Sequence, residues 1–228
     1  MDERPSPNHD DRRGRAVDMI VIHYTGMRSA ADSLARLCDP AAKVSAHYLI
    51  DEQGGASRLV AEDRRAWHAG VAWWDGESDI NACSVGIELQ NPGHEFGYRA
   101  FPEPQIAALI ALTADIAARQ EVPAARILGH SDVAPTRKTD PGELFPWERL
   151  AEAGLGLWPE AWDPTHAVDP DGVRSALARI GYGWLSGPDA DTAAVIRTFQ
   201  RHWLPERVSG EADADTLLRI GNIARHMK

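Results

Sequence analysis

The sequence predicts an α/β (α+β) protein, with a mixed central sheet flanked by helices, plus a small C-terminal three-helix module. Two observations support this fold class. As far as about residue 155, short apolar runs typical of buried strands alternate with segments in which apolar residues recur at helical spacing. After a proline-containing stretch, three short helical patterns follow one another with no strand pattern between them.

The expected strands are short runs rich in β-branched and other apolar residues, which pack well on a pleated sheet. They cover residues 17–22, 46–51, 57–61, 84–89 and 126–128. Helices are expected at residues 30–37 and 104–120. In the longer helix, Ile106 and Leu109 lie on one face, and Pro104 suits the first turn.

Sequence character divides the chain into four parts. Residues 1–16 are polar and charged and are predicted to be a disordered tail. Residues 17–158 are expected to form the sheet domain, and residues 170–228 the three-helix module. Residues 159–169 lie between them and contain two prolines, so they are expected to be a linker. Trp162 in this linker indicates that it packs against a neighbouring surface.

The composition is that of a soluble globular protein, with 43% hydrophobic residues, 25% charged residues and a formal net charge of -10. An acidic chain argues against general binding of nucleic acid or of anionic membranes. Two cysteines cannot form a disulfide framework, and both are expected to be small buried residues.

The N-terminal residues lack the apolar stretch of a signal peptide, and no later segment is long enough to span a bilayer. The expected location is therefore cytoplasmic if Met1 is the native start. It is periplasmic if a signal peptide was removed ahead of Met1. Neither membrane insertion nor a protein partner is predicted.

Two histidines lie where a predicted strand meets a loop. His23 follows the run 17–22, and His130 follows the run 126–128. Asp140 comes next in a loop that contains several prolines. Two imidazoles and one carboxylate leave a fourth zinc position open for water, which is the pattern of a catalytic zinc site. From spacing alone, ordinary polar residues at strand ends are the more frequent alternative.

Two further residues are candidates for proton transfer and charge stabilisation. Glu88 lies inside an apolar strand, where a carboxylate is costly unless it has a partner. It is a candidate general base, and a structural carboxylate paired with an arginine is an equally frequent alternative. Lys138 lies two residues before Asp140 and could stabilise an oxyanion, although a solvated loop lysine is the more common reading of such a position.

Five segments, in this order along the chain, resemble the type-2 N-acetylmuramoyl-L-alanine amidase family, and the resemblance is strongest to its AmpD/AmiD-type bacterial members. Together they span about residues 17–158. No single segment is decisive, but five in the family's order are specific. The segments are residues 21–25, 45–51, 65–70, 84–89 and 129–142.

The resemblance implies a zinc-dependent hydrolase. It implies that His23, His130 and Asp140 bind one Zn²⁺ ion, and that Glu88 and Lys138 are catalytic. The expected reaction is hydrolysis, by a zinc-activated water, of the amide bond between N-acetylmuramic acid and L-alanine. The expected substrate is peptidoglycan or a muropeptide, with the 1,6-anhydro sugar as one candidate form.

Several other side chains receive weaker interpretations. The resemblance places the segment of Trp67 and His68 along the substrate cleft, so both are candidate substrate-binding residues. For Trp67, packing in the core is the more frequent alternative. His47 is expected to be a packed strand histidine rather than a ligand. Asp132 follows His130 closely and could accept the second N–H of that imidazole, as metal-binding histidines often require; a plain loop residue is the alternative.

The C-terminal module resembles the three-helix peptidoglycan-binding domain. The resemblance depends on residues 189–192, 195–200 and 210–217. Because every candidate catalytic residue precedes it, the module is predicted to be dispensable for bond cleavage. Its matching capping motifs and the pattern of residues 195–200 indicate glycan binding. Structural support of the first domain is the alternative, since Trp158 and Trp162 could join the two parts.

Two other functions compete with the amidase hypothesis. A non-catalytic peptidoglycan receptor on the same fold is disfavoured because the chain retains both histidines, the aspartate, Glu88 and Lys138. A zinc hydrolase that acts on another amide, such as an N-acetyl group, would share the metal chemistry. Metal analysis separates the first alternative from the amidase, and product identification separates the second.

Overall fold

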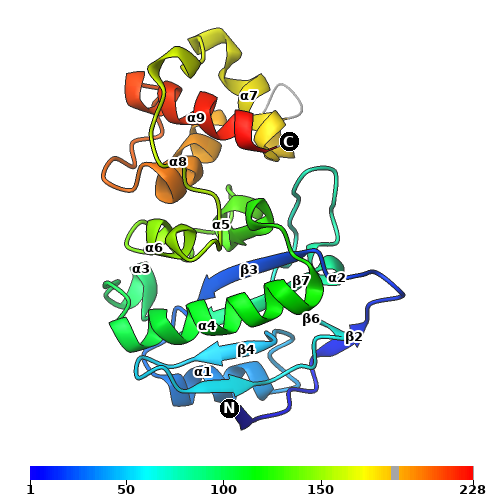
Figure 1. Cartoon of the computed structure of the whole chain (residues 1–228). Helices are drawn as coiled ribbons and strands as arrows, with labels where there is room; N and C mark the ends of the chain where they lie inside the picture. Colours follow the sequence, from blue (N-terminus) through cyan, green and yellow to red (C-terminus); the bar gives the residue numbers. More distant parts are fainter. Residues whose placement is uncertain (186–189, 228) are drawn as a thin grey trace.

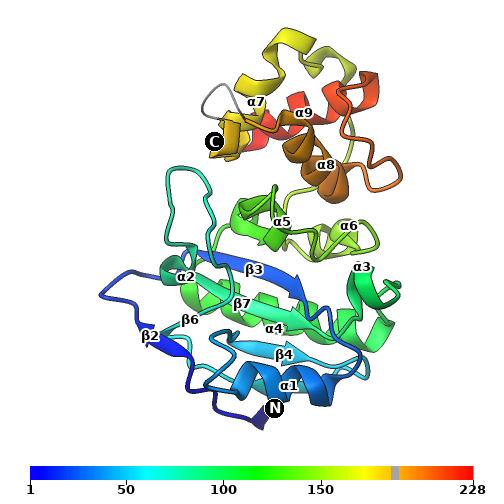
Figure 2. The same ribbon diagram turned by 180° about the vertical axis from the view of Figure 1, so that it is seen from behind.

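A computed structural model of the chain describes residues 1–185 and 190–227. Asp189 and Lys228, which belong to the predicted module, lie outside these residues. Figures 1 and 2 show a sheet with helices on both faces and, beyond α5 and α6, a group of helices formed by the C-terminal part of the chain.

Within the described residues, the main sheet has the strand order β1-β5-β4-β7-β3-β8. Its strands are β1 (Asp2–Glu3), β3 (Met19–Tyr24), β4 (Tyr48–Ile50), β5 (Ala56–Arg58), β7 (Ser84–Leu89) and β8 (Ile127–Gly129). The central strands β4, β7, β3 and β8 are parallel, and β5 is antiparallel to β4. The predicted mixed sheet is therefore confirmed.

The two faces of the sheet are buried under different elements. Helix α4 (Glu103–Gln120) covers one face and α1 (Ala30–Cys38) covers the other (Figures 1 and 2). Ile20 and Ile22 of β3 pack into the cluster that contains the α4 residues. Because side chains alternate along a strand, His23 projects to the opposite face.

The N-terminal segment is ordered, so the prediction of a disordered tail at residues 1–16 is wrong. Strand β1 pairs with β5, and β2 (His9–Asp11) pairs with β6 (Arg64–Ala66) in a second small sheet. Arg12 is buried, and its guanidinium donates to the backbone carbonyls of Glu62, Asn81, Ala82 and Ser84. A polar composition hides this order because hydrogen bonds to backbone, rather than apolar contacts, anchor the segment.

Four short helices, which lie between the strands or after the last one, were not expected from the sequence. They are α2 (Ile80–Cys83), α3 (Gly93–Phe96), α5 (His130–Val133) and α6 (Trp147–Glu152). Single 3₁₀ turns lie at Ala124–Arg126, Pro164–His166, Pro170–Gly172 and Gly183–Leu185. Two turns or less give too little apolar periodicity for prediction.

Among residues 170–185 and 190–227, the C-terminal part forms the three expected α-helices, which are α7 (Val173–Ile180), α8 (Thr192–Trp203) and α9 (Ala214–His226). Both α8 and α9 begin at an aspartate cap. Asp191 accepts from the backbone N–H of Ala194, and Asp213 accepts from that of Thr216, each at 2.9 Å.

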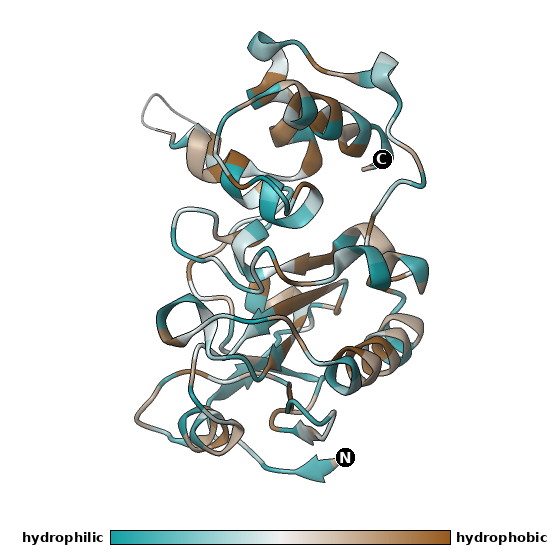
Figure 3. Cartoon of the chain, turned by 90° about the vertical axis from the view of Figure 1, so that its left-hand side faces the viewer, coloured by the Kyte–Doolittle hydropathy of each residue, from teal (hydrophilic) through white to brown (hydrophobic). Residues whose placement is uncertain are grey.

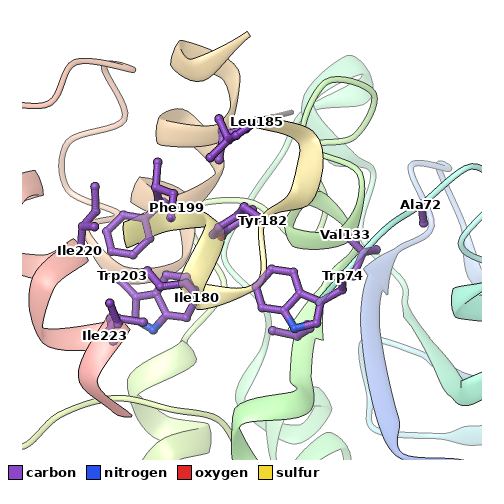
Figure 4. Packing of buried hydrophobic residues seen from close by; sticks show 14 of the residues in the cluster. Ala72, Trp74, Val133, Ile180, Tyr182, Leu185, Phe199, Trp203, Ile220 and Ile223 are labelled. Carbon is purple, nitrogen blue, oxygen red and sulfur yellow. The ribbon is translucent and has the colours of Figure 1, made fainter. Parts of the chain in front are cut away.

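The C-terminal helices share one hydrophobic core with the sheet domain. Trp74 and Val133 of the sheet domain belong to the same buried cluster as Tyr182, Phe199 and Ile220 (Figure 4). Figure 3 shows the hydrophobic residues gathered along the inner strands and on the inward faces of the C-terminal helices. The helices therefore do not bury their apolar faces only against one another.

The predicted linker is also attached to the C-terminal helices. The side-chain amide of Asn222 on α9 accepts from the backbone N–H of Asp163 and donates to its carbonyl. Trp158 and Trp162 pack against the shared core. Of the cysteines, Cys83 is buried as expected, whereas Cys38 is only partly buried. In the described part of the chain, no helix has both the length and the apolar character needed to cross a membrane.

Candidate active site

The site forms where the carboxyl ends of the central parallel strands meet. His23 and Glu88 are register partners on β3 and β7, so their side chains project from the same face of the sheet. His130 follows directly after β8, which pairs with the other edge of β3. Parallel pairing thus brings together residues that are 65 and 107 positions apart from His23.

Three ligand atoms converge at this point. Nδ1 of His23 lies 2.9 Å from Nδ1 of His130 and 3.2 Å from Oδ2 of Asp140. Nδ1 of His130 lies 3.0 Å from the same carboxylate oxygen. A tetrahedral metal with bonds of about 2.0–2.1 Å separates its ligand atoms by about 3.3 Å. The three buried side chains can therefore hold one metal ion.

Hydrogen bonds on the far sides of the two imidazoles decide which nitrogen faces the centre. Nε2–H of His130 donates to the carbonyl of Ala69 at 3.0 Å. Nε2 of His23 lies 3.0 Å from Nδ1 of His68. Nε2 of His68 lies 3.1 Å from Oγ of Ser84, whose hydroxyl donates to the carbonyl of Ile80.

This chain of bonds has one consistent assignment of protons. Because the hydroxyl of Ser84 donates elsewhere, it accepts from Nε2–H of His68. His68 then accepts at Nδ1 from Nε2–H of His23. Both His23 and His130 are therefore left with the lone pair of Nδ1 directed toward Asp140, which is the tautomer a metal requires.

Electrostatics favour the same protonation states. Burial, and then the neighbouring His130, lower the pKa of His23 to about 4, so this imidazole is neutral at pH 7. Burial opposes ionisation of Asp140, but His130 and His23 outweigh burial and hold the pKa of this carboxyl below its usual value. Neutral imidazole and ionised carboxylate are the forms that bind metal.

The loop that holds Asp140 is fixed to the end of β8. The backbone N–H of Ser131 donates to the carbonyl of Asp140 at 2.8 Å. Gly129 has no side chain, and a Cβ there would lie 2.6 Å from Cδ of Pro141. The loop can approach the strand this closely only because residue 129 is glycine.

Glu88 is buried without the partner that a structural carboxylate would have. Its exposed fraction is 9%, and its Oε2 makes no hydrogen bond. No ion pair of the described residues includes it. Burial, and then the charge of Asp140, raise the pKa of Glu88 to about 8. A carboxylate in this state is suited to accept a proton near neutral pH.

The site opens into a cavity of about 350 Å³. Its walls include all five residues that the sequence predicted as metal-binding or catalytic, which are His23, Glu88, His130, Lys138 and Asp140. Residues from the middle and the C-terminal end of α1, together with residues 25–27 of the loop before it, also line the cavity. The cavity is large enough for the junction between a sugar and a short peptide.

The N-acetylmuramoyl-L-alanine amidase family model matches residues 13–143. The chain belongs to this family. It is therefore an amide hydrolase, and the converging side chains lie in the cavity of an enzyme.

Individual relatives agree over more of the chain. The sequence is 39% identical over 224 residues to the N-acetylmuramoyl-L-alanine amidase AmiD of Escherichia coli (strain K12), covering 88% of this chain and 79% of that protein. It is 34% identical over 164 residues to the 1,6-anhydro-N-acetylmuramyl-L-alanine amidase AmpD of Enterobacter cloacae, covering 64% and 86% of the two chains.

Solved structures agree in fold. A complex of AmiD from E. coli with anhydro-N-acetylmuramic acid-L-Ala-D-gamma-Glu-L-Lys matches with a TM-score of 0.83 at 35% identity, covering 98% of this chain and 93% of that one. AmpDh3 from Pseudomonas aeruginosa matches with a TM-score of 0.82 at 31% identity, covering 95% and 93%. Both matches include the C-terminal helices.

The amidase cavity places the two candidate substrate residues differently from the sequence interpretation. Trp67 is not part of the cavity wall, and its indole N–H donates to Oδ2 of Asp10 in the N-terminal segment at 2.7 Å. His68 does line the cavity, but it lies behind His23 and fills the space above Gly86, where a Cβ would lie 2.4 Å from its ring. In the structure, His68 hydrogen-bonds His23, which is a candidate metal ligand.

His47 is a packed strand histidine, as expected. It is fully buried, and its Nδ1 accepts from the backbone N–H of Gly86 at 2.9 Å. Burial, and then Arg12, lower the pKa of His47 to about 3. It therefore supports the strands beneath the amidase cavity as a neutral side chain.

Asp132 does not accept the second N–H of His130, which goes to the backbone of Ala69 instead. Its Oδ2 accepts from the backbone N–H of Gly129 and from Nδ1–H of His202, both at 2.8 Å. Its Oδ1 accepts from the hydroxyl of Tyr182 at 2.7 Å. No sequence signal connects residues 50 and 70 positions apart, so these two partners were missed.

Proposed function

We propose that this chain is a zinc-dependent amidase in which His23, His130 and Asp140 bind one zinc ion. The observation that supports this most directly is the approach of three buried ligand atoms to within 3.2 Å of one another. Two neutral imidazoles and a carboxylate, with a fourth position for water, make up a donor set of catalytic zinc sites. When bound, zinc polarises a carbonyl oxygen and lowers the pKa of water.

Glu88 is the proposed general base. It takes a proton from the water that attacks the carbonyl carbon, and it delivers that proton to the nitrogen of L-alanine as the C–N bond breaks. The products are a carboxylate on the lactyl group of muramic acid and a free amino group on L-alanine. In the metal-free protein, burial and then the charge of Asp140 raise the pKa of Glu88 above its usual value, which moves it toward the pH at which the residue has to accept and release a proton.

Lys138 is the proposed electrostatic stabiliser of the reaction. It belongs to the cavity wall together with Glu88 and Asp140. Its ammonium group can donate to the carbonyl oxygen as negative charge develops on that oxygen. This interaction strengthens only as the transition state forms, so it contributes to turnover rather than to substrate binding.

The proposed substrates are muropeptides and peptidoglycan, including muropeptides that carry a 1,6-anhydro sugar. Ligands of this class are named in the complexes of AmiD and of AmpDh3. The cavity of about 350 Å³ supports this assignment, because its size suits the sugar–peptide junction that both substrates contain.

The C-terminal module, residues 170–228, is proposed to add contacts to glycan. A groove of about 470 Å³ lies where α6 meets the module. The tryptophans that line it, Trp147, Trp158 and Trp162, come from α6 and from the segment before the module, and Arg219 comes from α9 of the module. Aromatic rings offer apolar faces to the C–H faces of sugars, and the arginine offers donors to hydroxyl oxygens.

Product identification tests the proposed function. The purified protein is incubated with an anhydromuramoyl tripeptide, and mass spectrometry should detect the free anhydromuramic acid and the free tripeptide. Metal removal should stop the reaction, and zinc should restore it. Release of acetate instead would identify an N-acetyl hydrolase. No product at all, with zinc bound, would identify a binding protein.

A further inference from the structure

Asp132 is a buried carboxylate whose hydrogen-bond donors come mostly from the C-terminal module. It is 1% exposed and lies on α5, two residues after His130. One donor, the backbone N–H of Gly129, belongs to the sheet domain. The other two are the hydroxyl of Tyr182, just after α7, and Nδ1–H of His202 on α8.

Both module donors are held rigidly. The ring of His202 is stacked between Trp147 and Trp203, with centroid separations of 3.7 Å on each side. Tyr182 is fully buried, and Trp74 meets its ring edge-on at 4.9 Å (Figure 4). Because packing holds both donors in place, their positions fix the position of the Asp132 carboxylate.

The short helix that carries Asp132 also carries one of the candidate metal ligands and is hydrogen-bonded to the residue that supplies another. His130 is its first residue. The backbone N–H of Ser131 donates to the carbonyl of Asp140, so this hydrogen bond ties the backbone of Asp140 to the same helix. A shift of α5 would therefore displace Nδ1 of His130 and Oδ2 of Asp140 relative to His23, which is fixed in the sheet.

We propose that Tyr182 and His202 are positioning residues of the metal site, which act through Asp132 on His130 and Asp140. The proposal rests on the proposed zinc-dependent function, because it concerns the geometry of those ligands. An unpaired buried carboxylate is costly, so loss of a donor makes α5 move or admit water. The C-terminal module is then part of the amidase site, which contradicts the expectation that it is dispensable for cleavage.

Tyr182→Phe and His202→Phe test the proposal in the full-length chain. Tyr182→Phe removes one oxygen atom and keeps the ring against Trp74. His202→Phe keeps a flat ring between the two tryptophans and removes the donor. Trp184→Phe is the matched control, because it removes a different bond from the module to α5, the indole N–H of Trp184 to the carbonyl of Val133 at 3.0 Å, and leaves the three bonds of Asp132 in place. It therefore separates an effect that passes through Asp132 from a general loosening of the junction.

Zinc affinity, measured by competition with a chromophoric chelator, is the first readout. Each test variant should bind zinc about tenfold more weakly, which is the low end of the effect of direct hydrogen-bond partners of metal ligands, because Tyr182 and His202 act one step further from the ligands. Trp184→Phe should stay within about twofold of wild type even if its melting temperature falls. Amide hydrogen exchange of residues 130–133 in the metal-free protein should be faster in Tyr182→Phe.

Wild-type zinc affinity and exchange in Tyr182→Phe would overturn the proposal, and so would an equal loss of affinity in Trp184→Phe. If His202→Phe does not fold, Tyr182→Phe alone decides. Failure of the proposed function looks different. If the proposed function is wrong, the wild-type protein will contain no more zinc than His23→Ala, as metal analysis of the two proteins would show.

Discussion

Glu88 lies directly opposite His23 on the neighbouring parallel strand, with their Cα atoms in register. The same pairing that builds the sheet thus sets a carboxylate beside a candidate metal ligand at one end of the cavity. No partner among the described residues hydrogen-bonds Oε2 of this carboxylate. A side chain retained at such a cost is expected to be used in the reaction rather than in the fold.

Glu88→Gln should remove most turnover and leave zinc bound. The amide has nearly the same shape as the carboxylate but cannot accept a proton from water. General bases contribute about 10²–10⁴ in rate, so kcat should fall by that factor. Steady-state kinetics and metal analysis of the same sample check both parts. A rate near wild type would remove Glu88 from the mechanism.

Stability of the metal-free protein should depend on Glu88 and on pH. Folding raises the pKa of this carboxyl from 4.5 to about 8, so its contribution to stability is present below about pH 4.5 and is lost as the pH rises through 8. The melting temperature of metal-free Glu88→Gln, measured relative to that of the wild type, should therefore be higher at about pH 9 than at about pH 5.

Thermal unfolding of both proteins at the two pH values measures this difference. Zinc should reduce it, because a nearby cation favours the ionised carboxylate. An equal difference at both pH values would mean that Glu88 does not change its protonation state in this range.

The candidate metal and catalytic residues were predictable because each follows a recognisable local pattern. His23 and His130 end apolar strands, and Glu88 interrupts one. Asp140 and Lys138 lie in a segment that resembles one family closely. The structure brings all five to the wall of one cavity, and their roles in metal binding and catalysis stay predictions. Parallel strands whose ends meet at one edge make such a convergence readable from sequence.

The parts that were not predictable depend on polar contacts between distant segments. Arg12 orders the N-terminal segment by bonding to backbone carbonyls, which composition does not report. Tyr182 and His202 meet Asp132 only after the module has docked. Trp67 was assigned to the cleft by the position of its segment, whereas its side chain turns toward Asp10.

His68 should affect zinc affinity rather than substrate affinity. His68→Ala removes the acceptor for Nε2–H of His23, so zinc should bind about 10–100-fold more weakly. His68→Asn is the matched variant, because its Oδ1 can replace Nδ1 as acceptor, and it should recover part of the loss. Chelator competition and KM at saturating zinc are the measurements. A raised KM with unchanged zinc affinity would restore the substrate-binding interpretation.

Lys138→Ala should lower kcat by about 10²–10³ with little change in KM, because its contact with the carbonyl oxygen strengthens only in the transition state. Lys138→Arg keeps the positive charge and should retain part of the rate. Initial rates across a range of muropeptide concentrations separate the two constants. A change confined to KM would show that Lys138 binds the ground-state substrate.

Trp162 allows the glycan-binding role of the module to be tested without removing the module. Arg219 lies over its ring at 4.1 Å from the centroid, and Trp158 meets the ring edge-on at 5.9 Å. The groove that these side chains line is distinct in its residues from the catalytic cavity. A polymer bound at the cavity could reach it, whereas a single muropeptide would be held by the cavity alone.

Trp162→Ala should therefore lower kcat/KM on whole sacculi by about tenfold, which corresponds to about 1.4 kcal/mol for one lost aromatic contact. The rate on a soluble muropeptide should not change. Trp162→Phe keeps a ring and should act on sacculi at an intermediate rate. Equal losses on both substrates with a lowered melting temperature would show instead that Trp162 only joins the linker to the shared core. Unchanged rates on both would place glycan binding, if the module has it, away from this groove.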